Sequence, residues 1–165
     1  MTYEKARFGG LFYCPIMYYI NSMTHNENPS DKEVYKILAE AKTIAVVGAS
    51  PNSARTSHAI MKKLQEWGYR TIPVNPGHDE ILGEKCYPDL TSIPEKIDIV
   101  DVFRKPEHTP PIAEEAVKIG AKVLWLQQGI SNDEAAAKAS AGGLTVIQDY
   151  CIAVAHGMLH VPIKE

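Results

Sequence analysis

The fold is decided by one stretch, Thr43-Ile-Ala-Val-Val-Gly-Ala-Ser-Pro-Asn-Ser-Ala-Arg-Thr-Ser57. Its apolar half, from Ile44 to Val47, is typical of a strand buried on both faces in a parallel sheet. Gly48 ends that run, and small polar residues lead into a segment, from about Ser57 to Trp67, that predicts a helix. A strand that turns on glycine into a helix N-terminus offers free backbone N–H groups and the positive end of the helix dipole to an anion. Two interpretations stay open at this point: a phosphate site, or only the first tight connection of an α/β domain.

The composition is that of an ordinary globular chain. Its 165 residues suffice for one domain but not for two separate cores, and a content of 45% hydrophobic and 22% charged residues argues against disorder. The net charge of −3 provides no overall positive field, so we expect no binding to nucleic acid or to an anionic membrane. Cys14, Cys86 and Cys151 are widely spaced, which disfavours a disulfide framework or a zinc ribbon and favours a reducing, cytoplasmic location.

The first 22 residues differ from the rest of the chain. The apolar stretch from Leu11 to Ile20 is interrupted by Pro15 and is shorter than the ~20 residues of a membrane-spanning helix. It also lacks the uninterrupted apolar core and the cleavage site of a signal peptide. Because Met23 opens a polar stretch that resembles a natural start, we expect residues 1–22 to be a non-native or disordered extension, and residues 23–165 to form a single domain.

Strand-like and helix-like segments alternate along the remaining chain. Strands are predicted at 43–47, 69–74, 97–103, 122–126 and 144–147, and helices at 30–41, 57–67, 110–119 and 132–141, with Gly68 and Gly120 as caps. Segment 81–88 predicts a loop or short extension, and 89–94 a single helical turn. This alternation predicts an α/β, Rossmann-like, doubly wound fold with a mainly parallel five-stranded sheet and helices on both faces.

The segments that follow the strands are the candidate ligand site, because ligands of doubly wound sheets bind outside the carboxyl ends of the strands. These segments provide amides, hydroxyls, glycines and the positive charges of Arg55, Arg104, Lys105 and His78. They contain no nucleophile–base pair and no converging carboxylates. The pattern indicates a site that holds a phosphorylated nucleotide without breaking its bonds, although a solvated strand end is the less favoured alternative for Arg104 and Lys105.

Two features of an NAD site are missing from the sequence, and this limits which nucleotide it is expected to bind. A dinucleotide fingerprint has three glycines, whereas the first turn has only Gly48, and the second strand ends at Val74-Asn75-Pro76 without an acidic residue for the ribose hydroxyls. Both absences disfavour NAD and are compatible with NADP or coenzyme A, which bear an additional phosphate. A Walker-type phosphate loop is also missing from the sequence.

Four motifs together resemble a known family. They are Val46-Val-Gly-Ala-Ser-Pro51, Gly68-Tyr-Arg-Thr-Ile-Pro-Val-Asn-Pro76, Ile81-Leu-Gly-Glu-Lys-Cys-Tyr-Pro-Asp-Leu90 and Val123-Leu-Trp-Leu-Gln-Gln-Gly129. In this order they look like the single-domain CoA-binding proteins, which are similar to the N-terminal domain of the succinyl-CoA synthetase alpha subunit. The resemblance covers about Ser30 to Cys151 and implies coenzyme A bound across the strand ends.

The resemblance also implies the binding residues. They are Gly48, Ala49, Ser50 and Pro51 at the phosphates, Arg55 and Ser57 at the helix start, Val74, Asn75, Pro76 and His78 on the adenosine side, and Phe103, Arg104, Gln127 and Gln128 after the third and fourth strands. The synthetase's phosphorylated histidine belongs to a second domain that this sequence lacks, so ligase chemistry does not transfer. Many family members have Arg-Cys-Pro after the fifth strand, where this chain has Tyr150-Cys151-Ile152.

The C-terminal segment and Trp125 allow other interpretations. The spacing of His156 and His160 beside Cys151 is compatible with a metal, but the apolar neighbours favour an ordinary C-terminal segment, and we expect no metal site. Trp125 is predicted to be a core residue, and the position of Cys151 after the fifth strand raises the hypothesis of a mixed disulfide with the CoA thiol. Two functions remain: a non-catalytic protein that binds CoA or an acyl-CoA as a carrier or regulator, and an NADP-dependent oxidoreductase with an unrecognised catalytic group.

Overall fold

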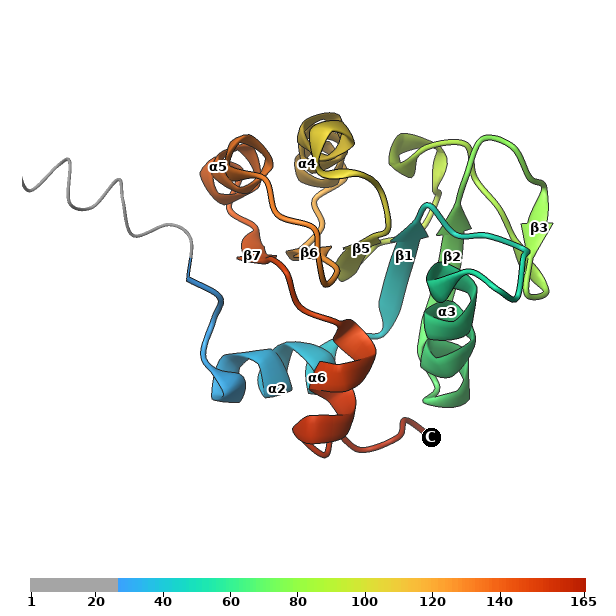
Figure 1. Cartoon of the computed structure of the whole chain (residues 1–165), viewed down its shortest axis with the longest axis horizontal. Helices are drawn as coiled ribbons and strands as arrows, with labels where there is room; N and C mark the ends of the chain where they lie inside the picture. The colour runs from blue at the N-terminus through green and yellow to red at the C-terminus, as the bar shows by residue number, and fades with distance from the viewer. Residues whose placement is uncertain (1–26) are drawn as a thin grey trace, which may run out of the picture.

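The computed structural model describes residues 27–165, which form one α/β unit (Figure 1). The elements in chain order are α2 (Asp31–Glu40), β1 (Thr43–Val47), α3 (Thr56–Glu66), β2 (Arg70–Val74), β3 (Glu80–Ile81), β4 (Glu84–Lys85), η1 (Leu90–Ser92), β5 (Ile99–Val102), η2 (Pro106–His108), α4 (Thr109–Lys118), β6 (Val123–Leu126), α5 (Asp133–Ala141), β7 (Thr145–Ile147) and α6 (Ile152–Met158). The expected extension at 1–22 lies outside the described residues.

Five strands form a single parallel sheet in the order β2-β1-β5-β6-β7. The chain starts at β1, moves to one side for β2 and returns to the other side for β5, so the winding direction reverses at β1. This order confirms the predicted Rossmann-like, doubly wound sheet. It also identifies the carboxyl ends of β1 and β5 as the switch point at which such sheets bind ligands.

Two hydrophobic cores separate the sheet from its helices. Helices α2, α3 and α6 cover one face, where Leu38, Met61 and Trp125 are fully buried. Helices α4 and α5 cover the other face with small residues, including Ala113 and Ala139. Figure 1 shows α4 and α5 on one side of the sheet and α2, α3 and α6 on the opposite side. The burial of Trp125 confirms its predicted place in the core.

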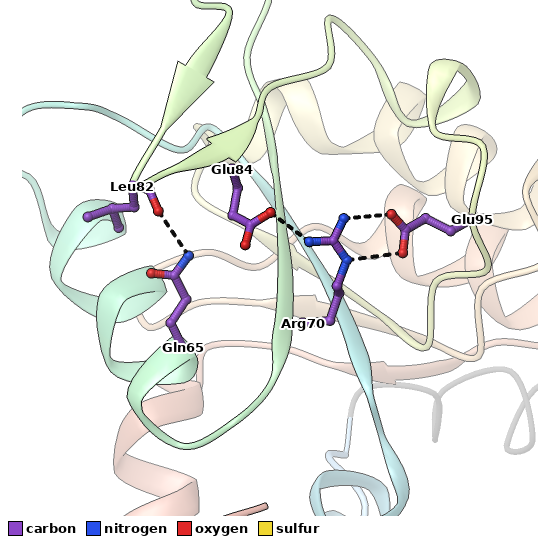
Figure 2. Close-up of polar contacts among 5 residues, drawn as sticks. All are labelled: Gln65, Arg70, Leu82, Glu84 and Glu95. Atoms are coloured by element: carbon purple, nitrogen blue, oxygen red, sulfur yellow. Dashed lines mark hydrogen bonds and ion pairs between the residues drawn. The ribbon is translucent and has the colours of Figure 1, made fainter. Parts of the chain in front are cut away.

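The segment after β2 is folded back against the sheet by a hairpin. Antiparallel β3 and β4 form this hairpin, and Tyr87 bridges to Val74 at the end of β2. On the outside, Arg70 Nη1 donates to Glu84 at 2.6 Å and Arg70 Nη2 donates to Glu95 at 2.8 Å, as Figure 2 shows. Gln65 Nε2 of α3 also donates to the carbonyl of Leu82. The predicted loop is therefore a short hairpin that fixes the path of the chain beyond β2.

The structure differs from the sequence prediction in two places. The third strand, predicted at 97–103, contains only Ile99–Val102, although the backbone of Asp98 still donates to Thr43 and accepts from Val123 at its start. The side chain of Asp98 accepts hydrogen bonds from the amides of Lys42 and Thr43. Residues after the fifth strand, for which no helix was predicted, form α6 and pack its buried residues Ile152 and Ala155 into the first core. None of the helices within residues 27–165 is long and apolar enough to cross a membrane.

Candidate functional site

The turn after β1 is built on Gly48, whose φ of +85° lies in the left-handed region that favours glycine. Its N–H donates to the carbonyl of Val74 at 2.9 Å, which ties the turn to β2. A Cβ atom at this position would lie 2.4 Å from the carbonyl oxygen of Phe103, so the chain after β5 passes directly against the turn. Glycine is therefore required both by backbone conformation and by this close approach.

Hydrogen bonds hold the loop between the turn and α3 in one shape. Asn75 Nδ2 donates to the carbonyl of Ala49 at 2.8 Å, and His58 Nδ1 lies 2.9 Å from the carbonyl oxygen of Ser50. Within the loop, the backbone amide of Asn52 donates to Ser50 Oγ, and Oδ1 of Asn52 accepts from the backbone amide of Ala54. The loop therefore needs little rearrangement to receive a ligand, because its own polar groups already define its path.

The first turn of α3 points its backbone amides at this loop. Its N-cap residue is Arg55, whose side chain does not cap the helix, and the amides of Thr56 and Ser57 have no partner among residues 27–165. Unpaired N–H groups and the helix dipole together favour an anion at such a terminus. A hollow of about 420 Å³ opens here, lined by Gly48, Ala49, Ser50, Arg55, Thr56, Ser57, Asn75, Phe103 and Arg104. The guanidinium groups of Arg55 and Arg104 give this hollow its positive charge.

A second hollow continues from the first across the ends of β5 and β6. It measures about 480 Å³ and is lined by Thr56, Phe103, Arg104, Lys105, Pro106, Gln127, Gln128, Ile130 and Cys151. Thr56, Phe103 and Arg104 line both hollows, so the two form one groove along the carboxyl edge of the sheet. We call this continuous groove the edge groove. Its first part is polar and positively charged, whereas Phe103, Pro106 and Ile130 give its second part apolar walls.

A buried carboxyl lies beneath the second hollow. Asp101 of β5 is fully buried, and its Oδ1 accepts a hydrogen bond of 2.7 Å from Gln127 Nε2. Burial raises the pKa of Asp101 to about 7, and the bond from Gln127 only partly opposes this shift. Sequence analysis missed Asp101 as part of the site, since a single acidic residue inside an apolar strand gives no sign of its burial. Its one signal was the position, two residues before Phe103 at the strand end.

The sequence-predicted site residues fall into three groups. Ten of them line the edge groove: Gly48, Ala49, Ser50, Arg55, Ser57, Asn75, Phe103, Arg104 and, in the second hollow only, Gln127 and Gln128. Pro51, Pro76 and His78 are exposed and line neither hollow. The side chain of Val74 packs into the core on the α4 side. Sequence reasoning left out Thr56, Pro106 and Ile130 as groove residues.

The three C-terminal residues that raised a metal interpretation do not come together. Cys151 lines the second hollow, whereas buried His156 stacks on Trp67 with ring centroids 3.9 Å apart. Burial lowers the pKa of His156, and the charge of Lys164 lowers it further. His160 is exposed. Within the part of the chain that the structure describes, no cluster of three or more His, Cys, Asp or Glu side chains is arranged to hold a metal ion.

Comparisons with known proteins point in one direction. The family model of the CoA binding domain matches residues 42–157. An uncharacterized protein of Bacillus subtilis, YneT, is 48% identical over 132 residues, which cover 80% of this chain and 98% of YneT. The ADP-forming acetate–CoA ligase of Methanocaldococcus jannaschii is 33% identical over 87 residues, which cover 53% of this chain but only 12% of the ligase. The solved structure of a hypothetical protein from Pyrococcus horikoshii OT3 superposes with a TM-score of 0.79 at 42% identity, covering 83% of this chain and 95% of that one.

Proposed function

The chain belongs to the family of CoA-binding domains, and from this premise we propose that it binds coenzyme A or an acyl-CoA in the edge groove without transforming it. The observation that supports this proposal most directly is the continuity of the groove. A positively charged hollow at the start of α3 joins a second hollow with apolar walls, and the two share Thr56, Phe103 and Arg104. Coenzyme A has the matching division into a negatively charged, phosphorylated nucleotide and a long, uncharged pantetheine arm.

The nucleotide end of the ligand fits the first hollow by charge. Two guanidinium groups, Arg55 and Arg104, and the amides of the first turn of α3 are available to phosphate oxygens. Charge-assisted hydrogen bonds of this kind are about twice as strong as neutral ones. No acidic side chain lines this hollow, so a ligand with an additional phosphate on its ribose meets no repulsion there.

The non-catalytic part of the proposal rests on the groups that face the groove. Its lining side chains among the described residues include no histidine and no carboxylate that would activate the thiol of Cys151 or a hydroxyl of the walls as a nucleophile. The ADP-forming ligase is about eight times longer than the segment it shares with this chain, and its activity is a property of that whole protein. We therefore propose a role in carrying CoA or in sensing it for a partner.

Calorimetry and thermal shift with four ligands test the proposal. The chain is titrated with CoA, dephospho-CoA, NADP and NAD under the same buffer and salt. We expect CoA to bind most tightly, with dephospho-CoA weaker because it lacks the ribose phosphate, and at 100 times Kd to stabilise the fold by about 2.7 kcal/mol. Absence of CoA binding at millimolar concentration would refute the proposal, and a preference for NADP over CoA would favour an oxidoreductase instead.

A further inference from the structure

The carboxyl of Asp101 is placed where the fold itself gains nothing from it. It lies in the middle of the sheet, level with Val46 of β1 and Trp125 of β6, and it is 0% exposed. Its Oδ1 accepts from Gln127, but its Oδ2 has no hydrogen-bond partner among the described residues. A buried carboxyl oxygen without a partner is destabilising, so an apolar residue here would serve the core better.

Gln127 connects this carboxyl to the second hollow. It follows directly on β6, is only 4% exposed and lines the hollow. An ionised carboxylate can only accept hydrogen bonds, so the amide group Nε2 of Gln127 must face Asp101. The carboxamide oxygen then faces away from Asp101. This oxygen has no hydrogen-bond partner within residues 27–165. It is not one of the fully buried polar atoms that lack a partner, so it is still in contact with solvent.

We propose that Asp101 is a positioning residue that fixes the carboxamide of Gln127, so that its Oε1 offers the edge groove a hydrogen-bond acceptor for an amide N–H of the pantetheine arm. This inference rests on the proposed function, because it assumes that the arm reaches the second hollow. The surrounding walls support that position. Phe103, Pro106 and Ile130 provide apolar contact along the groove, and Gln127 adds a polar contact of defined direction.

A protonated Asp101 would no longer fix the orientation of the Gln127 carboxamide. A neutral carboxyl can donate its O–H to Gln127 Oε1, which lets the carboxamide turn and present its N–H groups to the groove instead of an acceptor. Burial brings the pKa of Asp101 to about 7, so this exchange falls near neutral pH. The other ionisable groups on the surrounding elements are His58 on α3, Arg104 and Lys105 after β5, and Tyr150, Cys151 and His156 on the approach to α6 and within it.

The test compares two ligands on three proteins. Calorimetry gives the Kd of CoA and of adenosine 3′,5′-bisphosphate, which lacks the pantetheine arm, for the wild type, Asp101→Asn and Gln127→Met between pH 5.5 and 8.5. At pH 8.5 we expect both substitutions to weaken CoA by roughly threefold to tenfold, the range of one hydrogen bond, and to leave the bisphosphate unchanged. In the wild type, the preference for CoA falls as the pH drops through 7. In Asp101→Asn the preference for CoA should lack this change near pH 7. The titration of the ligand phosphates affects all three proteins alike, so it cancels when one protein is compared with another.

Asp98→Asn is the matched control, since it makes the same change just before the same strand, next to the opposite edge of the sheet. It should alter neither the preference for CoA nor its pH dependence. Equal losses for both ligands in Asp101→Asn would overturn the inference and leave Asp101 a structural residue only. A preference that changes with pH alike in the wild type, in Asp101→Asn and in Gln127→Met would overturn it as well, and Gln127→Met still provides this comparison if Asp101→Asn fails to fold. Failure of both ligands to bind the wild type would instead refute the proposed function.

Discussion

Two aspartates three residues apart show how differently the two edges of the sheet are built. Asp98, at the amino edge, accepts from the amides of Lys42 and Thr43 and pairs with Lys122 at 2.8 Å. Burial by itself raises its pKa, but the bonds from Lys122 and from the two amides outweigh burial and lower it. Asp101, at the carboxyl edge, has a single donor and a raised pKa.

The difference between the two edges is one of hydrogen-bond satisfaction. At the amino edge the protein supplies the partners of Asp98 itself, and a small hollow of about 140 Å³ there is lined by Asp98 and Lys122. At the carboxyl edge the amides of α3, the guanidinium of Arg104 and Oε1 of Gln127 are left to solvent or to a ligand. These groups bond to water in the free protein and are open to a ligand, whereas the buried Oδ2 of Asp101 has no partner among the described residues and costs stability.

Substitution of Gly48 should break the carboxyl edge most severely. Gly48→Ala adds a Cβ atom 2.4 Å from the carbonyl of Phe103 and forces a side chain into the left-handed region. We expect roughly 2–6 kcal/mol of lost unfolding free energy and no measurable CoA binding. Denaturant unfolding and calorimetry measure the two effects. Gly120→Ala is the control, because its φ is also positive but no atom lies within 4 Å of its Cβ, and it should keep CoA affinity unchanged.

Asp98 and Asp101 should make opposite contributions to the pH dependence of the unfolding free energy. Because the folded-state pKa of Asp101 is raised, the wild type loses stability as pH rises from about 4 to above 7, by at most about 4 kcal/mol. Asp101→Asn removes this loss, so its melting temperature should exceed that of the wild type at pH 8.5 and not at pH 4. Thermal melts across pH measure this crossover, and a variant less stable than the wild type at pH 8.5 would contradict it.

Asp98→Asn should give the reverse result. A lowered folded-state pKa contributes stability above the unfolded pKa, and that contribution disappears as pH falls through the folded value. We expect a loss of about 1–3 kcal/mol at pH 7, because the amides of Lys42 and Thr43 and the ammonium of Lys122 lose an ionised acceptor. The loss should shrink below pH 4. The same melts test it, and a loss of equal size at all pH values would contradict the assignment.

Removal of one cation at each edge compares binding with structure. Arg104→Gln should weaken CoA by roughly tenfold and reduce the salt dependence of its Kd, because one charge-assisted contact is lost from the groove. Lys122→Gln removes a cation at the amino edge, where its partner is Asp98, and should leave the Kd of CoA unchanged. Calorimetry at two salt concentrations distinguishes them, and equal effects of the two variants would show that only net charge matters.

The smallest effect is expected on the outer side of the hairpin. Arg70 contacts Glu84 and Glu95 (Figure 2), but its side chain is 48% exposed, and exposed ion pairs contribute little. Arg70→Met should therefore cost less than about 1 kcal/mol and leave CoA binding intact. Denaturant unfolding with a parallel titration measures both quantities. A large loss of CoA affinity would mean that the hairpin, and not only the strand ends, controls the groove.

The sequence alone predicted most of the fold and about two thirds of the groove. Apolar runs such as Ile44 to Val47 and the glycine turn at Gly48 are local signals, and the structure confirms the elements they predict. Arg55 and Arg104 were predicted from the rule that strand ends in a parallel sheet meet at one edge, and both line the first hollow, while their contact with CoA stays a prediction. Helix α6 was missed because its seven residues are too short for a clear helical periodicity.

Only the tertiary structure decided how distant residues act on one another. The strand order brings Asp101 and Gln127, which are 26 residues apart, within 2.7 Å, and no local pattern encodes that pairing. The pKa of a carboxyl depends on how completely the assembled fold removes it from water and on the donors that it meets there. Asp98 and Asp101 therefore look alike in the sequence, but the fold lowers the pKa of Asp98 and raises that of Asp101. Local periodicity determines the elements, whereas burial and strand order determine what their side chains can do.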